Sequence, residues 1–249
     1  AGKTDAFITK LSWADLSIIS STYVGGSEND YGTSIALDNL GYPYITGYTE
    51  SPVSPITLFP ITPGAFQTSY AGGKYDAFIT KMNPALTQLN YSTYLGGNGE
   101  DRGYDIAVDN MSNAYITGMT ISDNFPRKNA YQPAIGGLVS DAYLTIMNET
   151  GKGLVFSTYL GGTYYDEGRG IAITEDGLNI TLTGFTESTN FPLENAYQGY
   201  LAGFPPVRYN DAFITKFVKI PPVANFTSDR ITGCSPALIC FNDTSTNNP

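Results

Sequence analysis

The chain has 249 residues, and 41% of them are hydrophobic, which is enough for the core of one large β-domain or two smaller domains. Its formal net charge of −10 excludes a general electrostatic affinity for nucleic acid or anionic lipid. The sequence contains no histidine, so a Ser-His-Asp triad and zinc or haem sites with histidine ligands are excluded as well.

There is no sign of a membrane-inserted segment. No stretch reaches the ~18 apolar residues that a spanning helix needs, and no signal peptide opens the chain. Residue 1 lies shortly before a repeated signature at Asp5. We therefore expect a processed piece of a longer secreted protein, with no membrane insertion in this segment.

The first part of the chain predicts four short strands. Residues 5–12 alternate between apolar and polar side chains, and residues 17–24 form the next strand. After a Gly-Gly break, residues 33–37 form a short apolar run, which is typical of a strand buried on both faces. A turn at 38–41 leads into the strand at 42–49.

These segments recur along the chain. The signature Asp-Ala-Phe-Ile-Thr-Lys begins at Asp5, Asp76 and Asp211, with the variant Asp-Ala-Tyr-Leu-Thr-Ile at Asp141. Ser-Thr-Tyr, Gly-Gly, Asp-x-Gly, Ile-Ala and Thr-Gly motifs follow in the same order three times. The period of about 70 residues holds four strands, which predicts one β-propeller blade per period.

The period is longer than the ~40–50 residues of common propeller repeats. The additional length lies between the second and third strands, where Phe-Pro and then Phe-Gln or Tyr-Gln recur within 59–67, 125–132 and 191–198. We expect this excursion to fold back and to pack its Phe and Tyr side chains against its own blade.

These motifs, complete between Tyr91 and Pro126, closely resemble the SBBP repeat family of predicted seven-bladed propellers in bacterial and archaeal surface proteins. The resemblance covers roughly residues 5–219. It implies an all-β fold, a β-propeller of four-stranded antiparallel blades with about three repeats present. The third copy departs most, since Thr174 replaces Asp109.

The predicted strands number two, four, four and three in successive repeats. A propeller has at least about four complete blades, so the ring is expected to be incomplete. Either upstream blades supply the missing strands, or another copy of the chain completes the open sheet edges.

A second domain is predicted at 221–249, after the repeats at 1–220. Its first residues resemble the opening of a PKD domain, which implies a truncated immunoglobulin-like β-sandwich, because such a domain needs about 100 residues. Cys234 and Cys240 could form a disulfide in an oxidising compartment if a turn separates them.

Two sets of aspartates recur. Asp30, Asp101 and Asp166 follow the Gly-Gly pairs and either bind Ca²⁺, the one cofactor considered, or cap a turn through backbone hydrogen bonds. Asp5, Asp76, Asp141 and Asp211 begin one strand of each repeat, where an aspartate usually accepts bonds from loop amides.

No residue is assigned as catalytic, cofactor-binding or metal-binding. A glycosidase would need a unique carboxylate pair in one cleft, whereas these acids recur in every repeat. Lys10, Lys81 and Lys216 close equivalent strands and are interpreted as surface or edge-protecting residues.

Six Asn-x-Ser/Thr sequons are candidates for glycosylation. They begin at Asn90, Asn110, Asn148, Asn179, Asn225 and Asn242. Together with the acidic charge they favour an extracellular glycoprotein at a cell surface.

Two functions remain open. The favoured one is a non-enzymatic structural or interaction module of a surface, sheath or filament protein, with such proteins or further copies of itself as partners. The alternative is a propeller that binds or processes carbohydrate through exposed Tyr and Asp side chains.

Overall fold

The computed structural model describes residues 3–52, 59–137, 139–202, 210–219, 226–228 and 241–243. This part of the chain is all-β and contains no helix, and therefore no helix that could span a membrane. The chain divides into two compact units, Ala1–Phe217 and Val218–Pro249. In the second unit, β14 (Phe226–Ser228) and β15 (Phe241–Asp243) form an antiparallel pair. Both cysteines lie outside the described residues.

The repeats form 13 strands in four antiparallel sheets. The first sheet contains β1 (Ala6–Leu11) and β2 (Ile18–Val24). The second contains β3 (Asp30–Leu37), β4 (Pro43–Thr49), β5 (Asp76–Met82) and β6 (Leu89–Leu95). The third contains β7 (Asp101–Val108), β8 (Ala114–Thr120), β9 (Asp141–Met147) and β10 (Leu154–Leu160). The fourth contains β11 (Asp166–Ile173), β12 (Asn179–Thr186) and β13 (Asp211–Val218). The predicted fold class and the distribution of two, four, four and three strands are confirmed.

Turn chemistry explains why consecutive strands pair. In the turn between β3 and β4, the Asp38 carboxylate accepts hydrogen bonds from the backbone N–H groups of Leu40 and Tyr42, both at 3.0 Å. Gly41 has a φ of +79°, a conformation that glycine adopts without steric cost. The equivalent Asp109 caps the turn between β7 and β8 in the same way. A local sequence thus closes each hairpin before any contact between sheets is needed.

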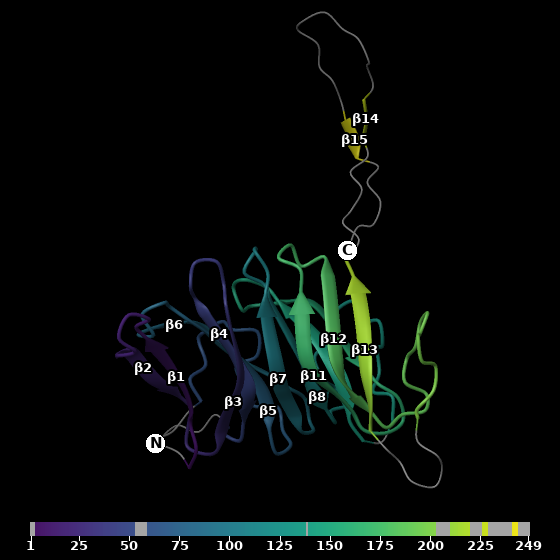
Figure 1. The fold of residues 1–249 in the computed structure, drawn as a ribbon, viewed down its shortest axis with the longest axis horizontal. Helices are drawn as coiled ribbons and strands as arrows, with labels where there is room; N and C mark the ends of the chain where they lie inside the picture. Colours follow the sequence, from purple (N-terminus) through teal and green to yellow (C-terminus); the bar gives the residue numbers. More distant parts are fainter. Residues whose placement is uncertain are drawn as a thin grey trace, which may run out of the picture. The chain divides into compact units, whose positions relative to one another are not determined.

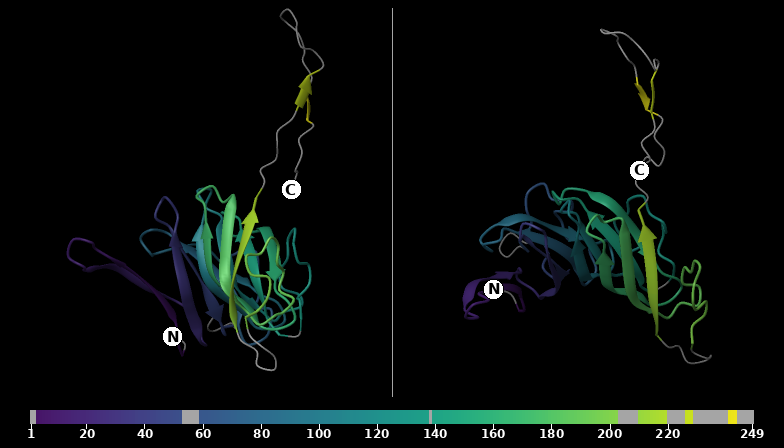
Figure 2. Two further views of the ribbon diagram at one scale, coloured as in Figure 1. Left: turned by 45° about the vertical axis from the view of Figure 1, so that its right-hand side comes forward. Right: turned by 45° about the horizontal axis from the view of Figure 1, so that its top comes forward.

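The four sheets lie side by side in chain order, and β1–β2 and β13 mark the two ends of the stack (Figure 1). The two further views show the same order, and the sheets do not close into a ring (Figure 2). We call the side of each sheet that packs on the next sheet along the chain its forward face, and the opposite side its rear face.

Strand alternation supplies both faces with apolar side chains. Ile79 lies on the forward face of the second sheet and packs in one buried cluster with Ile116 and Tyr143 of the third. The neighbouring residue Phe78 points to the rear face and packs with Ile8 of the first sheet. The core is therefore a series of layers between sheets, and each sheet depends on its neighbours for burial.

The prediction that residues 33–37 are buried on both faces is wrong. Ile35 of β3 is 54% exposed, whereas its equivalent in the third sheet, Ile106, is 5% exposed. Ile106 packs against the second sheet. The first sheet holds only strands equivalent to the third and fourth of a blade. Ala6 of β1 reaches β3 at Gly32, but the described residues include no first or second strand of that sheet to cover Ile35.

The excursion between the second and third strands packs its Phe as predicted. Phe59 and Phe125 are buried, and their ring centroids lie 4.7 Å from Phe78 and 4.6 Å from Tyr143 of their own sheets. In the fourth sheet, Phe191 lies 4.6 Å from the ring of Phe213.

The second aromatic of the excursion also reaches the following sheet, which the sequence did not predict. Phe66 packs on a cluster that contains Tyr44 and Ile79 of its own sheet, as predicted. The Tyr131 ring lies 6.3 Å from that of Phe217 in the following sheet. Phe66 joins the cluster between the second and third sheets, and its N–H donates to the Gly151 carbonyl of the third. Tyr197, which has no described sheet after its own, is fully exposed.

Candidate functional site

The aspartates at the start of the first strand of each blade are buried turn caps. Their Oδ2 atoms accept a hydrogen bond from the N–H of the second glycine in the Gly-Gly pair. These distances are 2.6 Å from Gly26 to Asp30, 2.7 Å from Gly97 to Asp101 and 2.7 Å from Gly162 to Asp166. A serine hydroxyl after the second strand also donates to each, from Ser51, Ser122 and Ser188 at 3.1, 2.8 and 2.7 Å.

The aspartates at the start of the third strand accept bonds from the excursion. The N–H of Ala71 donates to Asp76 at 2.7 Å, and that of Gly136 donates to Asp141 at 2.8 Å. The N–H of Ala202 donates to Asp211 at 2.5 Å. The prediction that these aspartates accept bonds from loop amides is confirmed for Asp76, Asp141 and Asp211. It is not confirmed for Asp5, whose buried Oδ1 has no hydrogen-bond partner in the described residues.

A glutamine from each of two excursions joins the aspartate to the Gly-Gly pair. Gln67 Nε2 donates to the Ser69 carbonyl at 3.0 Å and lies 3.4 Å from Asp76 Oδ2, while its Oε1 accepts the Gly96 N–H at 3.0 Å. Gln132 makes the equivalent bonds to Ala134, Asp141 and Gly161. This contact explains why Gln follows the aromatic residue in the sequence.

We expect Gln67→Leu to destabilise the fold, because the substitution leaves the Gly96 N–H without its acceptor in a part-buried position. The expected loss is about 2 kcal/mol in the free energy of unfolding, the usual cost of an unsatisfied buried group. Urea denaturation of the variant measures it. The same substitution at the exposed Gln88 is the control, and an equal effect at both positions would contradict the bridging role.

The two sets of aspartates converge in pairs, which sequence reasoning did not foresee. A Cβ placed on Gly96 would lie 2.7 Å from Asp76 Oδ1 and 3.0 Å from Asp101 Oδ2. Gly161 holds the same position between Asp141 and Asp166. The signal was present in the sequence, since both aspartates keep a fixed spacing from the Gly-Gly pair in every copy.

Burial and pairing raise the pKa of these carboxyl groups. Desolvation is the main cause, and it raises the pKa of Asp76 to about 8 and those of Asp101 and Asp141 to about 7. The charge of Asp101 further raises the pKa of Asp76, and that of Asp166 further raises the pKa of Asp141. Burial also raises the pKa of Asp30 and Asp166. Neutral pH therefore leaves protons inside the network.

The geometry around these aspartates does not resemble a calcium site. Ca²⁺ takes six to eight oxygen ligands. In the described ranges, no group of three or more Asp, Glu, Cys or His side chains lies close enough together to hold a metal ion. The Oδ2 atoms of Asp30, Asp101 and Asp166 are occupied by glycine N–H and serine donors.

The interpretation of Lys81 as a surface or edge residue is wrong. Its Nζ lies 3.3 Å from Asp38 Oδ2, and it sits over the Tyr44 ring at 4.6 Å from the centroid. The Lys81 side chain is only 11% exposed, since β5 is an inner strand of its sheet. Lys10 and Lys216, on β1 and β13 at the ends of the stack, are exposed as predicted.

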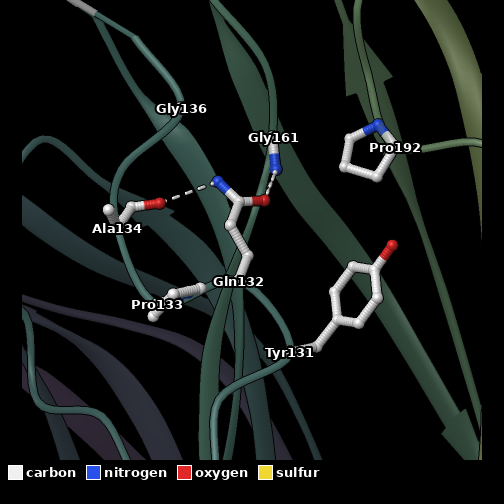
Figure 3. Close-up of a pocket in the computed structure, with 7 residues that line it drawn as sticks. All are labelled: Tyr131, Gln132, Pro133, Ala134, Gly136, Gly161 and Pro192. Carbon is white, nitrogen blue, oxygen red and sulfur yellow. Dashed lines mark hydrogen bonds between the residues drawn. The ribbon is translucent and has the colours of Figure 1, made fainter.

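A shallow pocket of about 520 Å³ lies between the excursions of the third and fourth sheets. Figure 3 shows the Tyr131 ring opposite Pro192, with Gln132 turned toward Gly161 and Ala134. The polar atoms of Gln132 are used by the fold. Tyr131 is 63% exposed, so its aromatic ring can contact a ligand in this pocket.

The sequons occupy different environments. Asn110 is exposed in the turn between β7 and β8, and Asn90 is exposed on β6. Asn148 and Asn179 are half-buried, and Asn148 Oδ1 accepts bonds within its turn. Asn242 lies on β15, and Asn225 lies outside the described residues. The exposure of Asn90 and Asn110 makes them the accessible candidates among the described sequons.

The sheets define the class of the protein as one built from β-propeller-type blades. Residues 21–52 and 90–126 match the model of the SBBP beta-propeller repeat. Each match runs from the fourth strand of one sheet through the first two strands of the next. No curated protein matches the chain. Such repeats are a generic interaction scaffold.

Proposed function

We propose that the chain is a non-enzymatic extracellular module of a cell-surface, sheath or filament protein. It acts through rigid display of loops and through contacts at its sheet edges and end faces. Its partners are other surface or filament proteins. Residues 221–249 are the start of a PKD-like domain in this proposal.

The observation that carries the proposal is the exposure of core-type side chains at the start of the stack. Phe7 is 70% exposed, whereas its equivalent Phe78 is completely buried. Tyr23 is 77% exposed, whereas its equivalent Tyr94 is completely buried. Large exposed apolar patches mark interaction surfaces. In the described part of the chain, the outer edges of β1 and β13 also lack a partner strand.

The repeated carboxyl pairs support a non-enzymatic role. A catalytic acid must contact its substrate, but Asp76, Asp101, Asp141 and Asp166 are completely or almost completely buried. Their environment is the same in successive sheets, so the fold explains them without a substrate. The negative charge and the exposed sequons at Asn90 and Asn110 support an extracellular location.

Hydrogen exchange tests the proposal on material from its native surface. We expect the amides of the outer strands β1 and β13 to exchange more slowly in native material than in the isolated chain, because a bound partner protects them. Amides of the inner strand β8 serve as the internal control. Equal exchange of β1 and β13 in both samples would contradict a role of these edges.

Carbohydrate binding is the second candidate, favoured by the exposed Tyr131 beside Pro192 in the shallow pocket. An aromatic ring of this kind can stack on a sugar. Tyr200, which is also exposed and does not line the pocket, provides the control. Binding on a glycan array that is lost in Tyr131→Ala and kept in Tyr200→Ala would favour this candidate. An array without signal would remove it.

A further inference from the structure

This inference rests on the proposed function and names the partner. We propose that the end faces bind a second copy of this chain head to tail, with the forward face of the fourth sheet against the rear face of the first.

In the described residues, no layer covers the rear face of the first sheet. Phe7 and Tyr23 of the first sheet, and Ile35 on the rear face of the second, are all more than half exposed. Their equivalents in the third sheet, Tyr143, Tyr159 and Ile106, are buried in the cluster shared with the second sheet.

The forward face of the fourth sheet is open in the same way. Ile214 of β13 is 79% exposed, whereas the equivalent residues Ile79 and Leu144 are completely buried. Tyr197 is also fully exposed, while the equivalent Phe66 packs in the layer toward the following sheet. In the inner sheets, the equivalents of Ile214 and Tyr197 contact the following sheet. In the described residues, no sheet lies against these two side chains.

The two open faces are complementary because the chain already contains their contact three times. Each internal layer sets a forward aliphatic residue in one cluster with a rear aromatic residue. The pairs are Ile8 with Phe78, Ile79 with Tyr143, and Leu144 with Phe213. The next pair in this series is Ile214 with Phe7, and both members are exposed. A second copy supplies the missing member at each end.

This contact is heterologous, since the two faces differ and lie at opposite ends of the stack (Figure 2). Such a contact forms rings where the rotation closes and filaments where it does not. Each copy carries a net charge of −10, so salt weakens the repulsion between copies while the apolar layer remains. Association is therefore expected to strengthen as the salt concentration rises.

Sedimentation velocity of the purified chain tests the proposal. We expect species at multiples of 26.8 kDa, and weaker association by at least tenfold in Phe7→Ser and in Ile214→Ser. Phe7→Ser keeps an intact forward face, and Ile214→Ser keeps an intact rear face. An equimolar mixture of the two variants is therefore expected to form dimers and no larger species.

Met111→Ser is the matched control, because Met111 is 58% exposed in the turn between β7 and β8 of the third sheet, away from both end faces. Circular dichroism establishes that each variant is folded, and Tyr23→Ser provides an independent rear-face variant. A wild-type chain that stays monomeric in high salt would overturn the proposal. Homodimers of either single variant, or a mixture that remains monomeric, would overturn it as well.

The sedimentation result and the hydrogen-exchange result can fail independently, so they test the self-association and the proposed function separately. A monomeric chain whose β1 and β13 amides are protected in native material would exclude a second copy as the partner and retain the interaction role. Self-association without protection in native material would overturn both, because the contact would then be absent from the native surface.

Discussion

Gly118→Ala is expected to prevent stable folding of the repeats. A Cβ on Gly118 would lie 1.8 Å from the carbonyl oxygen of Arg102 on the paired strand and 3.0 Å from the Tyr143 ring. Neither neighbour is a flexible side-chain end, so the backbone of β7 or β8 must move. Overpacking of a close-packed interior costs about 3 kcal/mol, and here the displaced group is backbone.

The same close approach of a glycine to a backbone carbonyl of the paired strand recurs in the second and fourth sheets. Gly47 and Gly184 have the same 1.8 Å relation to the carbonyls of Tyr31 and Glu167. In each case the glycine lies opposite a register shift, such as that between Gly103 and Asp105. The repeated Thr-Gly motif is thus required for the bulge in the first strand pair.

Urea denaturation and soluble yield measure the effect of Gly118→Ala. Gly199→Ala is the control, because nothing lies within 4 Å of the added Cβ at that position. Gly118→Ala with a free energy of unfolding within about 0.5 kcal/mol of wild type, the usual range of a surface change, would show that the strand pair adapts.

The folded repeats are expected to lose stability as the pH rises from about 5 to 8. An unfolded aspartate has a pKa of about 3.9, whereas burial raises the pKa of Asp76 to about 8 and those of Asp101 and Asp141 to about 7. Between these values the native state holds protons that the unfolded chain has released. The contribution of these groups is therefore fully present below about pH 4 and is lost as the pH rises through 7 to 8.

The expected decrease in the free energy of unfolding is at least about 3 kcal/mol, which is the contribution of a single carboxyl group whose pKa is shifted by about two units. Urea denaturation at a series of pH values measures it. Asp76→Asn removes one titrating group and is expected to reduce the slope, so that the variant loses less stability than wild type between pH 5 and 8.

Asp123→Asn, at an exposed position, controls for the substitution itself. A wild-type stability that increases between pH 5 and 8 would contradict the assignment of protons to the buried pairs. An unchanged slope in Asp76→Asn would place the titrating groups elsewhere.

The strands and their grouping into sheets were predictable from the sequence because their causes are local. The turn at 38–41 is closed by the carboxylate of Asp38 and by Gly41, all within a few residues. The recurrence of the Asp-Ala and Gly-Gly motifs then indicated how many strands each sheet receives. The packing of Phe59 and Phe125 was predictable for the same reason, since each contacts its own blade.

Contacts between distant segments were not predictable in this way. Asp76 and Asp101 belong to separate motifs in the sequence, and only the antiparallel pairing of β5 with β6 places both beside Gly96. Lys81 ends its strand as a surface lysine would, but the Asp38 carboxylate and the Tyr44 ring surround it in the folded sheet.

The sequence by itself determined the all-β class, the blade repeat and the strand order, because alternation and turn chemistry act within one period. Only the tertiary structure decided which equivalent residues are buried. Phe7 and Phe78 occupy the same place in their repeats, yet a preceding pair of strands and an excursion cover Phe78 alone. Burial in this fold depends on the neighbouring sheet, and a repeat motif carries no information about whether that neighbour is present.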